Sequence, residues 1–476
     1  MNQLTVKHYM FLRKNIWQNI FMVLVAILLC GCGKNTENEA TFTQQPDTNI
    51  AENLPTSELE IILPTSIPES SLPIQAVEQE KSPDSNDEVY LRLMEKWQAG
   101  KLSGLYSYAS DEMKALVDEE QFYNMFLGLS DTFGTIVKIE NEKSVSEGGN
   151  TTYTATLFFK HAEAYIQVYI CNSKIAGYNY DVRFVTDFEN KLENGITEYF
   201  FLLKSGDYNL NAVYTYTEDN NAPTILLIPG SGVADYNETV GLLPTFADIA
   251  MELAERGVNS LRFEKRTNRY ASEFTSESGL DEEYFTDCKA AIVWIENNNE
   301  STEIILFGHS LGGQVAVSLA EQEAVKGLIL FNSTARHLAE IAKDQYCAAD
   351  PVNEIYYQQY MEAAMNATKD TAKGYYYYGC SDFYWADYNG ISTLDTLKKT
   401  DIHTLIINSR FDRQIFEADI DLWQSEFEKD DKVTFMMLDD ISHFGYQIDT
   451  NDVASVYKNV EFPDDLADIF ARFCIE

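Results

Sequence analysis

The sequence predicts an α/β protein in which helices cover both faces of a mostly parallel sheet, preceded by a small α+β domain and a disordered tether. Strand and helix patterns alternate from Gly195 to Glu476, which is typical of a parallel sheet. From Glu88 to about Arg183, helical spacing comes first and strand-like alternation follows. Residues 33–87 hold six of the eleven prolines and few groups to bury, which favours a tether.

The composition agrees with a chain that mostly folds. Its 476 residues leave room for more than one domain, since domains average about 100–200 residues. Hydrophobic residues make up 45% and charged residues 23%, which disfavours a collagen-like fibre and a multi-span membrane protein. Lys and Arg number 35 against 75 for Asp and Glu, a net charge of −40. Because a surface this acidic repels phosphate backbones, we expect no nucleic-acid partner.

The amino terminus has the pattern of an export signal. Three basic residues, the last of them Lys14, precede an unbroken apolar run from Ile20 to Cys30, and residues 1–31 contain no acidic side chain. A basic region followed by a hydrophobic region is typical of a signal peptide. As a helix the run would span about 16 Å, about half of the 30 Å core of a bilayer, which disfavours a permanent transmembrane helix.

The segment Leu29-Cys30-Gly31-Cys32 resembles a bacterial lipobox. The resemblance implies that residues 1–31 are a lipoprotein signal peptide and that Cys32 is acylated, which would anchor the chain at the extracytoplasmic face of the cell membrane. An ordinary secretory cleavage nearby is the alternative. The tether, residues 32–87, would span about 40 Å as a coil. Charge screening acts over about 8 Å, so the acidic body could stand clear of anionic lipid.

The α+β domain is predicted at residues 88–190. Its strand candidates are 152–160 and 164–172, where every second residue is apolar. The helix order and the stretch 111–122 resemble the helix-and-curved-sheet cone of nuclear transport factors. Because no polar cluster converges within it, a spacer, a dimerisation surface or a substrate-presenting platform is favoured over a second active site. The oligomeric state is left open.

Cysteine and metal-ligand patterns are uninformative. Five cysteines at irregular spacing follow Cys32, which is no disulfide framework. Cys171 and Cys288 are expected to be buried thiols, and a pairing of Cys347 with Cys380 is disfavoured. No metal-ligand spacing occurs in the sequence, so we expect neither a metal nor another cofactor.

From residue 195 onward, buried strands are the main feature. Residues 210–217 alternate like a partly exposed antiparallel strand, and amphipathic stretches separate the later strands. Ligands in such folds bind beyond the carboxyl ends of the strands, so functional residues should directly follow a strand. The candidates for buried strands are residues 224–230, 259–265, 303–309, 327–333, 403–409 and 433–439.

Gly308, Ser310 and Gly312 form a G-x-S-x-G pattern between a buried strand and a helix-forming run. In this strand–turn–helix setting the pattern is a nucleophile elbow, where glycines permit a tight turn that lifts the serine hydroxyl clear of the sheet. Gly313 would permit close packing of the following helix. Ser310 is therefore the candidate nucleophile.

A serine nucleophile requires a histidine base. The predicted signal removes His8, His161 lies in the α+β domain, His309 lies inside the elbow, and His403 precedes its strand. Of the two remaining histidines, His443 follows the strand 433–439 and His337 follows the strand 327–333. His443 is favoured, because the chain order on such folds is Ser, then acid, then His.

The acid that orients the histidine should follow a strand between Ser310 and His443. Asp412 does so, just beyond the strand 403–409. Asp439 and Asp440 are competitors that could merely cap the turn leading to His443. A salt bridge of Asp412 with a flanking arginine is the alternative role for that residue.

An attacked carbonyl becomes an oxyanion, which needs hydrogen-bond donors. One candidate is the backbone N–H of Leu311, the residue after the nucleophile. The other should come from the glycine-rich loop Gly230–Gly232 that follows the first parallel strand. This loop lacks the spacing of either nucleotide-binding fingerprint, which disfavours a phosphate cradle.

These motifs resemble the α/β-hydrolases of the esterase and serine aminopeptidase-like branch, over residues 195–476. The resemblance implies Ser310 as nucleophile, His443 as base, Asp412 as its orienting acid, and the backbone of Ser231 and Leu311 as oxyanion donors. Many relatives have His-Gly where this chain has Pro-Gly, which puts the geometry of that loop in doubt. The matching motifs are PGSG (229–232), GHSLGG (308–313), RFD (410–412) and SHF (442–444), together with LRFEKR (261–266), to which no role is assigned.

A cap is expected at about 335–397, between two core strands. Its clustered aromatics could line an apolar substrate pocket or form the core of the cap itself. We therefore expect a serine hydrolase of carboxylic esters that acts on a small acyl substrate through an acyl-enzyme. The alternatives are a serine aminopeptidase, a thioesterase or acyltransferase, and a non-catalytic binding lipoprotein. The aromatics are Tyr356, Tyr357, Tyr360, Tyr375, Tyr376, Tyr377, Tyr378, Phe383, Tyr384, Trp385 and Tyr388.

Overall fold

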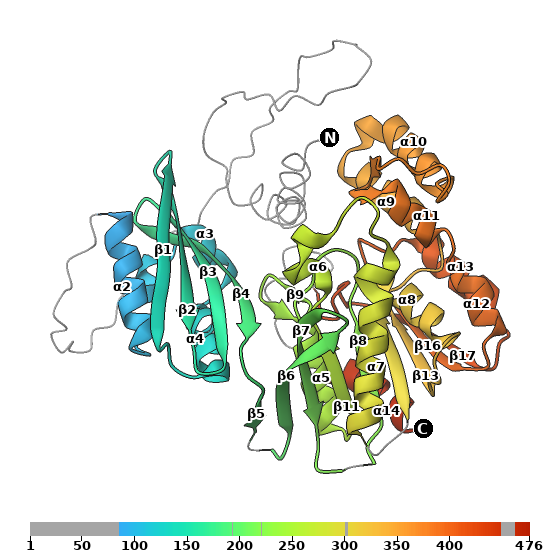
Figure 1. The fold of residues 1–476 in the computed structure, drawn as a ribbon, viewed down its shortest axis with the longest axis horizontal. Coiled ribbons are helices and arrows are strands. Elements are labelled where there is room, and N and C mark those ends of the chain that lie inside the picture. Colours follow the sequence, from blue (N-terminus) through green and yellow to red (C-terminus); the bar gives the residue numbers. More distant parts are fainter. Residues whose placement is uncertain (1–84, 193, 220, 300–302, 449–461) are drawn as a thin grey trace, which may run out of the picture.

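The computed structural model describes residues 85–192, 194–219, 221–299, 303–448 and 462–476 (Figure 1). The predicted signal peptide, Cys32 and nearly all of the tether lie outside these residues. Within the described ranges, no helix is both long and apolar enough to cross a bilayer. Figure 1 shows two lobes, with a smaller helix-and-sheet unit beside a large sheet whose cap helices lie at the upper right.

The smaller unit begins with helices and continues as a four-stranded antiparallel sheet in the order β1-β2-β3-β4. Ser85 caps the first helix by accepting the Glu88 N–H. Val89, Leu93 and Trp97 recur on one helical face and are buried against the sheet. The elements are α2 (Asn86–Gln98), η1 (Leu105–Tyr108), α3 (Asp111–Leu116), α4 (Glu119–Phe133), β1 (Lys138–Glu147), β2 (Asn150–Phe158), β3 (Ala162–Cys171) and β4 (Lys174–Phe184).

The large sheet has nine strands in the order β17-β16-β13-β12-β8-β11-β7-β6-β5. The first six of these pair in parallel, whereas β7, β6 and β5 are antiparallel to their neighbours. The predicted mostly parallel sheet is therefore present. The strands are β5 (Phe188–Lys191), β6 (Thr197–Ser205), β7 (Tyr208–Tyr216), β8 (Thr224–Ile228), β11 (Asn259–Phe263), β12 (Ile304–His309), β13 (Gly327–Phe331), β16 (His403–Ser409) and β17 (Val433–Leu438).

Helices cover both faces of this sheet. Side chains from α5 (Thr245–Glu255) and α14 (Asp464–Ile475) pack on one face. Side chains from α7 (Thr286–Asn298), α8 (Leu311–Ala320) and α13 (Glu417–Phe427) pack on the other. The short elements between them are β9 (Thr239–Val240), β10 (Leu243–Pro244), α6 (Arg266–Arg269), η2 (Ala271–Glu273) and η3 (Asp281–Phe285).

For two strands, the sequence-based prediction of how deeply the side chains are buried was wrong. In the strand expected to be partly exposed, Leu210–Thr215 are all buried, because Val213 packs with the core of the smaller unit while Ala212 packs on the opposite face. The last strand, β17, is only half-buried, since it forms the edge of the sheet.

Other boundaries also differ from the sequence-based ones. The first helix starts at Asn86 instead of residue 88, and β5 pairs with β6, so residues 188–191 join the large sheet rather than the smaller unit. Cys288 is buried, but Cys171 is half-exposed because it ends β3 on the less buried face. The five cysteines in the described part of the chain are free thiols.

The cap lies between β13 and β16 in the chain. Its helix α9 starts seven residues after Phe331, and α12 packs against the core helix α8. The elements of this stretch are α9 (Leu338–Ala349), η4 (Pro351–Asn353), α10 (Glu354–Met365), β14 (Tyr376–Tyr377), β15 (Cys380–Ser381), α11 (Asp382–Tyr388) and α12 (Thr393–Lys399).

Candidate active site

Ser310 occupies a strained turn between β12 and α8. Its backbone has φ 54° and ψ −122°, a conformation that side-chain-bearing residues rarely adopt and that is found at functional sites. Glycine is required nearby, because a Cβ at Gly308 would collide with the backbone of Gly313, and one at Gly312 would collide with the carbonyl of Ile228. The local geometry is that of a nucleophile elbow.

His443 and Asp412 are joined directly. The His443 Nδ1 lies 2.6 Å from the Asp412 Oδ2, and the Asp412 side chain is completely buried. The other oxygen of Asp412 accepts the N–H groups of Gln414 at 2.7 Å and Ile415 at 3.1 Å. A carboxylate only accepts hydrogen bonds, so Nδ1 carries the proton and Nε2 is free to act as a base.

The backbone of His443 is fixed beside the elbow. Its carbonyl accepts hydrogen bonds from the His309 Nε2 and the Asn332 Nδ2, both at 2.9 Å. The His309 and His443 rings lie 4.6 Å apart between centroids. Within the described part of the chain, no hydrogen bond joins the Ser310 hydroxyl to His443. Such bonds often tighten only when substrate binds.

The rival acids and bases are engaged elsewhere. Asp439 accepts a hydrogen bond from the Arg410 Nε at 2.6 Å on the surface, so this arginine does not pair with Asp412. His337 caps α9 and its Nε2 lies 2.7 Å from the Asn389 side chain. His403 is exposed at the start of β16.

The two expected oxyanion donors line one cavity with Ser310. Leu311 is the first residue of α8, so its N–H has no acceptor within the helix. Ser231 lies in the oxyanion loop, residues 229–233, which follows β8. Gly230 lies so close to the elbow that a Cβ there would be 3.1 Å from the Ser310 Cβ.

The comparisons with known proteins agree with this geometry. The chain is 24% identical to Esterase EstD of Thermotoga maritima over 348 residues, which cover 70% of this chain and 82% of that relative. The strand order and the elbow after β12 are those of the α/β-hydrolase fold. The chain has the α/β-hydrolase fold. No family model matches it.

Solved structures are also similar to this α/β-hydrolase. Est1E from Butyrivibrio proteoclasticus is 16% identical, with 58% of this chain and 98% of that chain covered and a TM-score of 0.40. The acylaminoacyl peptidase of Pyrococcus horikoshii is 14% identical, with 72% of this chain and 56% of that chain covered and a TM-score of 0.42.

Several buried polar residues near the site were not predicted from the sequence. Glu238 accepts the Gly230 N–H at 2.6 Å and lies 2.9 Å from the His309 Nδ1. Burial, the largest single influence, lowers the pKa of His309, but the charge and hydrogen bond of Glu238 and the hydrogen bond to the His443 carbonyl together raise that pKa. Lys265, from the motif without an assigned role, contacts Gly230 from the other side. Because His309 lies 71 residues from Glu238 and Lys265 lies 35 residues from Gly230, no local spacing could have revealed these two contacts.

The substrate cavity of the hydrolase is mostly apolar and has a volume of about 90 Å³, enough for several waters or a short acyl group. The buried cap aromatics serve both predicted roles. Tyr378, Tyr384 and Trp385 line this cavity and pack with the buried Tyr388. Tyr356 and Tyr360 are 48% and 41% exposed and serve neither role. Leu338 and Ile341 add aliphatic surface.

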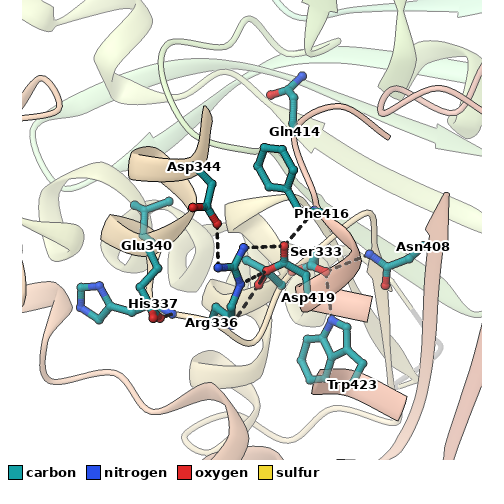
Figure 2. Close-up of polar contacts among 12 residues, drawn as sticks. Ser333, Arg336, His337, Glu340, Asp344, Asn408, Gln414, Phe416, Asp419 and Trp423 are labelled. Carbon is teal, nitrogen blue, oxygen red and sulfur yellow. Dashed lines mark hydrogen bonds and ion pairs between the residues drawn. The ribbon is translucent and has the colours of Figure 1, made fainter. Parts of the chain in front are cut away.

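An arginine joins the cap to the catalytic domain. Figure 2 shows Arg336 between Asp344 of α9 and Asp419 of α13. Its Nε and Nη2 each lie 2.9 Å from an oxygen of Asp419, and its Nη1 lies 2.8 Å from Asp344. Gln345 of the same cap helix donates to the carbonyl of Gln414, in the loop after Asp412. The first cap helix is therefore fixed to the loop that carries the acid.

Proposed function

We propose that this chain is a serine hydrolase that cleaves carboxylic esters through an acyl-enzyme, without a metal or cofactor. The observation that carries the proposal is the bonded pair of Asp412 and His443 beside a serine in a strained elbow. The similarity to an esterase supports the choice of ester substrates. The mostly apolar cavity at Ser310 supports a small acyl or aryl group as the part that is bound.

The chemistry follows from the roles of these groups. The His443 Nε2 takes the proton of the Ser310 hydroxyl as its oxygen attacks the ester carbonyl. The carbonyl oxygen becomes an oxyanion that accepts the N–H groups of Ser231 and Leu311. When this intermediate collapses, His443 gives its proton to the leaving alcohol, and the acyl group remains on Ser310. Water then attacks that acyl-enzyme with His443 again as base, which releases the acid.

Within this cavity, one contact favours an ester over an aminoacyl substrate. An aminopeptidase needs an unpaired acid to hold the substrate ammonium. The acid in the cavity wall is Glu283, and its Oε1 is bonded to the Lys265 ammonium at 2.6 Å. A substrate ammonium would have to displace that buried lysine, which is costly.

A matched pair of substrate series tests the proposal. Purified protein should hydrolyse p-nitrophenyl acetate and butyrate, and should leave aminoacyl p-nitroanilides intact. Ser310→Ala should abolish the ester activity while Ser318→Ala, on the same helix α8, should retain it. Preferred cleavage of the anilides would favour an aminopeptidase. Folded protein with neither activity, and without labelling by a fluorophosphonate, would favour a binding protein.

We also propose that the chain is lipid-anchored through Cys32 at the extracytoplasmic face, with the residues between Cys32 and the start of α2 at Asn86 as a tether to the smaller unit. The support for the anchor is the sequence pattern around Cys32. In a bacterial host, the full chain should take up a clickable fatty acid and sediment with membranes. Cys32→Ala should lose both properties, while Cys30→Ala should keep them. Uptake by neither protein would contradict the anchor.

A further inference from the structure

We propose that Lys265 and Tyr284 are positioning residues that aim the Ser231 N–H at the oxyanion. The inference rests on the proposed serine-hydrolase function and deepens it. Both side chains are almost completely buried behind the oxyanion loop, at 1% exposure each. Neither belongs to the proposed triad of Ser310, Asp412 and His443, so their effect would be exerted through the loop.

Two donors converge on one backbone carbonyl. The Gly230 carbonyl accepts hydrogen bonds from the Lys265 Nζ at 3.2 Å and from the Tyr284 hydroxyl. Lys265 also donates to the Tyr284 oxygen at 2.7 Å, and its Nζ lies 3.9 Å from the centre of that ring. The three groups therefore form a closed triangle that fixes the direction of the carbonyl.

The other end of the same glycine is fixed as well. The Gly230 N–H donates to the Glu238 carboxylate at 2.6 Å. The Gly230 N–H belongs to the peptide plane before this residue and the Gly230 carbonyl to the plane after it. Because both planes are held, the Gly230–Ser231 peptide has little freedom to rotate. In a trans peptide the carbonyl and the following N–H point in opposite directions. Because the Gly230 carbonyl points to Lys265 and Tyr284, the Ser231 N–H points away from them.

The residue that carries this N–H lies in the wall of the catalytic cavity. Ser231, Gly232, Ser310 and Leu311 all line it, and Gly230 lies against the Ser310 Cβ. An oxyanion formed at Ser310 would thus meet the N–H of Ser231 together with that of Leu311. The arrangement is pre-organised, which is what makes such donors effective in a transition state.

The positive charge of Lys265 should strengthen the Ser231 N–H as a donor, in addition to orienting it. Lys265 is bonded to Glu283 at 2.6 Å and to the Gly230 carbonyl. A donor that polarises a carbonyl also strengthens the N–H of the same amide, because hydrogen bonds in a chain reinforce one another at low dielectric. The buried ammonium would therefore make the Ser231 N–H a better donor as well as a better-aimed one.

The experiment compares variants of the full chain on p-nitrophenyl butyrate. Tyr284→Phe removes one hydroxyl and keeps the ring. Removing an oxyanion donor outright lowers kcat about 10²–10³-fold. Because Tyr284→Phe only loosens the peptide that carries the Ser231 N–H, it should lower kcat about tenfold with KM unchanged. Lys265→Met combined with Glu283→Gln removes the ammonium without leaving an unpaired acid, and should cost about 10²-fold. The control is Tyr153→Phe, which removes a buried hydroxyl bonded to Asp87 in the smaller unit and should keep full activity.

A transition-state analogue separates positioning from general stability. A trifluoromethyl ketone forms an oxyanion on the catalytic serine, so its affinity should fall by the same factor as kcat in both variants. Folded variants with unchanged kcat and unchanged ketone affinity would overturn the inference, as would a rise in KM alone. Wild-type protein without esterase activity or fluorophosphonate labelling would instead refute the proposed function, and the inference with it.

Discussion

The catalytic edge of the sheet and the cap are built in different ways. At the catalytic edge, the turns after β8, β12, β16 and β17, each candidate residue follows a strand closely, and hydrogen bonds hold the Gly230 N–H, the His443 carbonyl and the Asp412 carboxylate. The cap is a helical excursion, of which α12 packs on α8 and α9 is tied by Arg336. The edge thus determines the positions of the reacting atoms, whereas the cap presents side chains to the substrate. We expect mutations at the edge to change kcat, and mutations in the cap to change stability or substrate preference.

The largest effect should come from the base. His443→Ala should lower kcat about 10⁴-fold or more with the fold intact, because it removes the group that activates Ser310. His337→Ala, at the start of the cap, should cost less than tenfold. The measurement is ester turnover together with circular dichroism. A larger loss of kcat in His337→Ala than in His443→Ala would place the base in the cap and contradict the division of roles between edge and cap.

The next effect should come from the acid. Asp412→Asn should lower kcat about 10³–10⁴-fold, because an amide can hold the imidazole in the wrong tautomer. Asp439→Asn, whose carboxylate pairs with Arg410 on the surface, is the matched control and should retain nearly full activity. An equal loss in both variants would mean that the acid is shared between the two turns.

The ion pair of Arg336 with Asp419, which joins the cap to the catalytic domain, should contribute to the free energy of unfolding. Arg336→Met leaves the fully buried Asp419 carboxylate without its cation, which should cost about 3–5 kcal/mol of unfolding free energy. Arg410→Met removes an exposed ion pair and should cost about 1 kcal/mol or less. Urea unfolding of both variants measures the difference. If the two losses were equal, Arg336 would be no more than a surface contact.

A smaller effect should appear in substrate preference. Leu338→Ala enlarges the cavity at the cap side, so relative kcat/KM for a longer acyl chain should rise about tenfold, the value of one methylene or two in a pocket. Tyr356→Ala, on the exposed side of the cap, should leave the preference unchanged. Rates measured on p-nitrophenyl esters of increasing length provide the test. No change in the Leu338 variant would mean that the acyl group binds elsewhere.

The smallest effect should be a pH dependence at the edge. Burial lowers the pKa of His309, but Glu238 and the His443 carbonyl together raise that pKa overall. A histidine with a raised folded-state pKa stabilises the fold below its unfolded pKa of about 6.5, and this contribution is lost as pH rises through the folded value. His309→Gln should therefore destabilise more at pH 6 than at pH 9, by urea unfolding. His403→Gln, which replaces an exposed histidine, is the matched control.

The elements that the sequence predicted best are those coded by neighbouring residues. The run from 303 to 313 carries a buried strand, the required glycines and a helix, and the structure has all three. The exposure of β7 could not be predicted, since its second face is covered by a unit whose packing no local pattern encodes.

The support of the oxyanion loop was missed for a related reason. Gly230 meets Glu238 eight residues away, but it meets Lys265 and Tyr284 at separations of 35 and 54 residues. The Pro-Gly in place of His-Gly indicated that the loop is altered, but it did not indicate which residues take the place of the histidine. The contacts of Gly230 with Lys265 and Tyr284 exist only in the folded sheet, which brings the end of β11 and the turn before α7 together.

The most direct test of the central claim is the site of covalent labelling. Folded wild-type protein is treated with a fluorophosphonate, digested and mapped by mass spectrometry. A single adduct on Ser310 is predicted, formed much more slowly in His443→Ala. An adduct on another residue, or labelling at Ser310 that is equally fast without His443, would contradict the account.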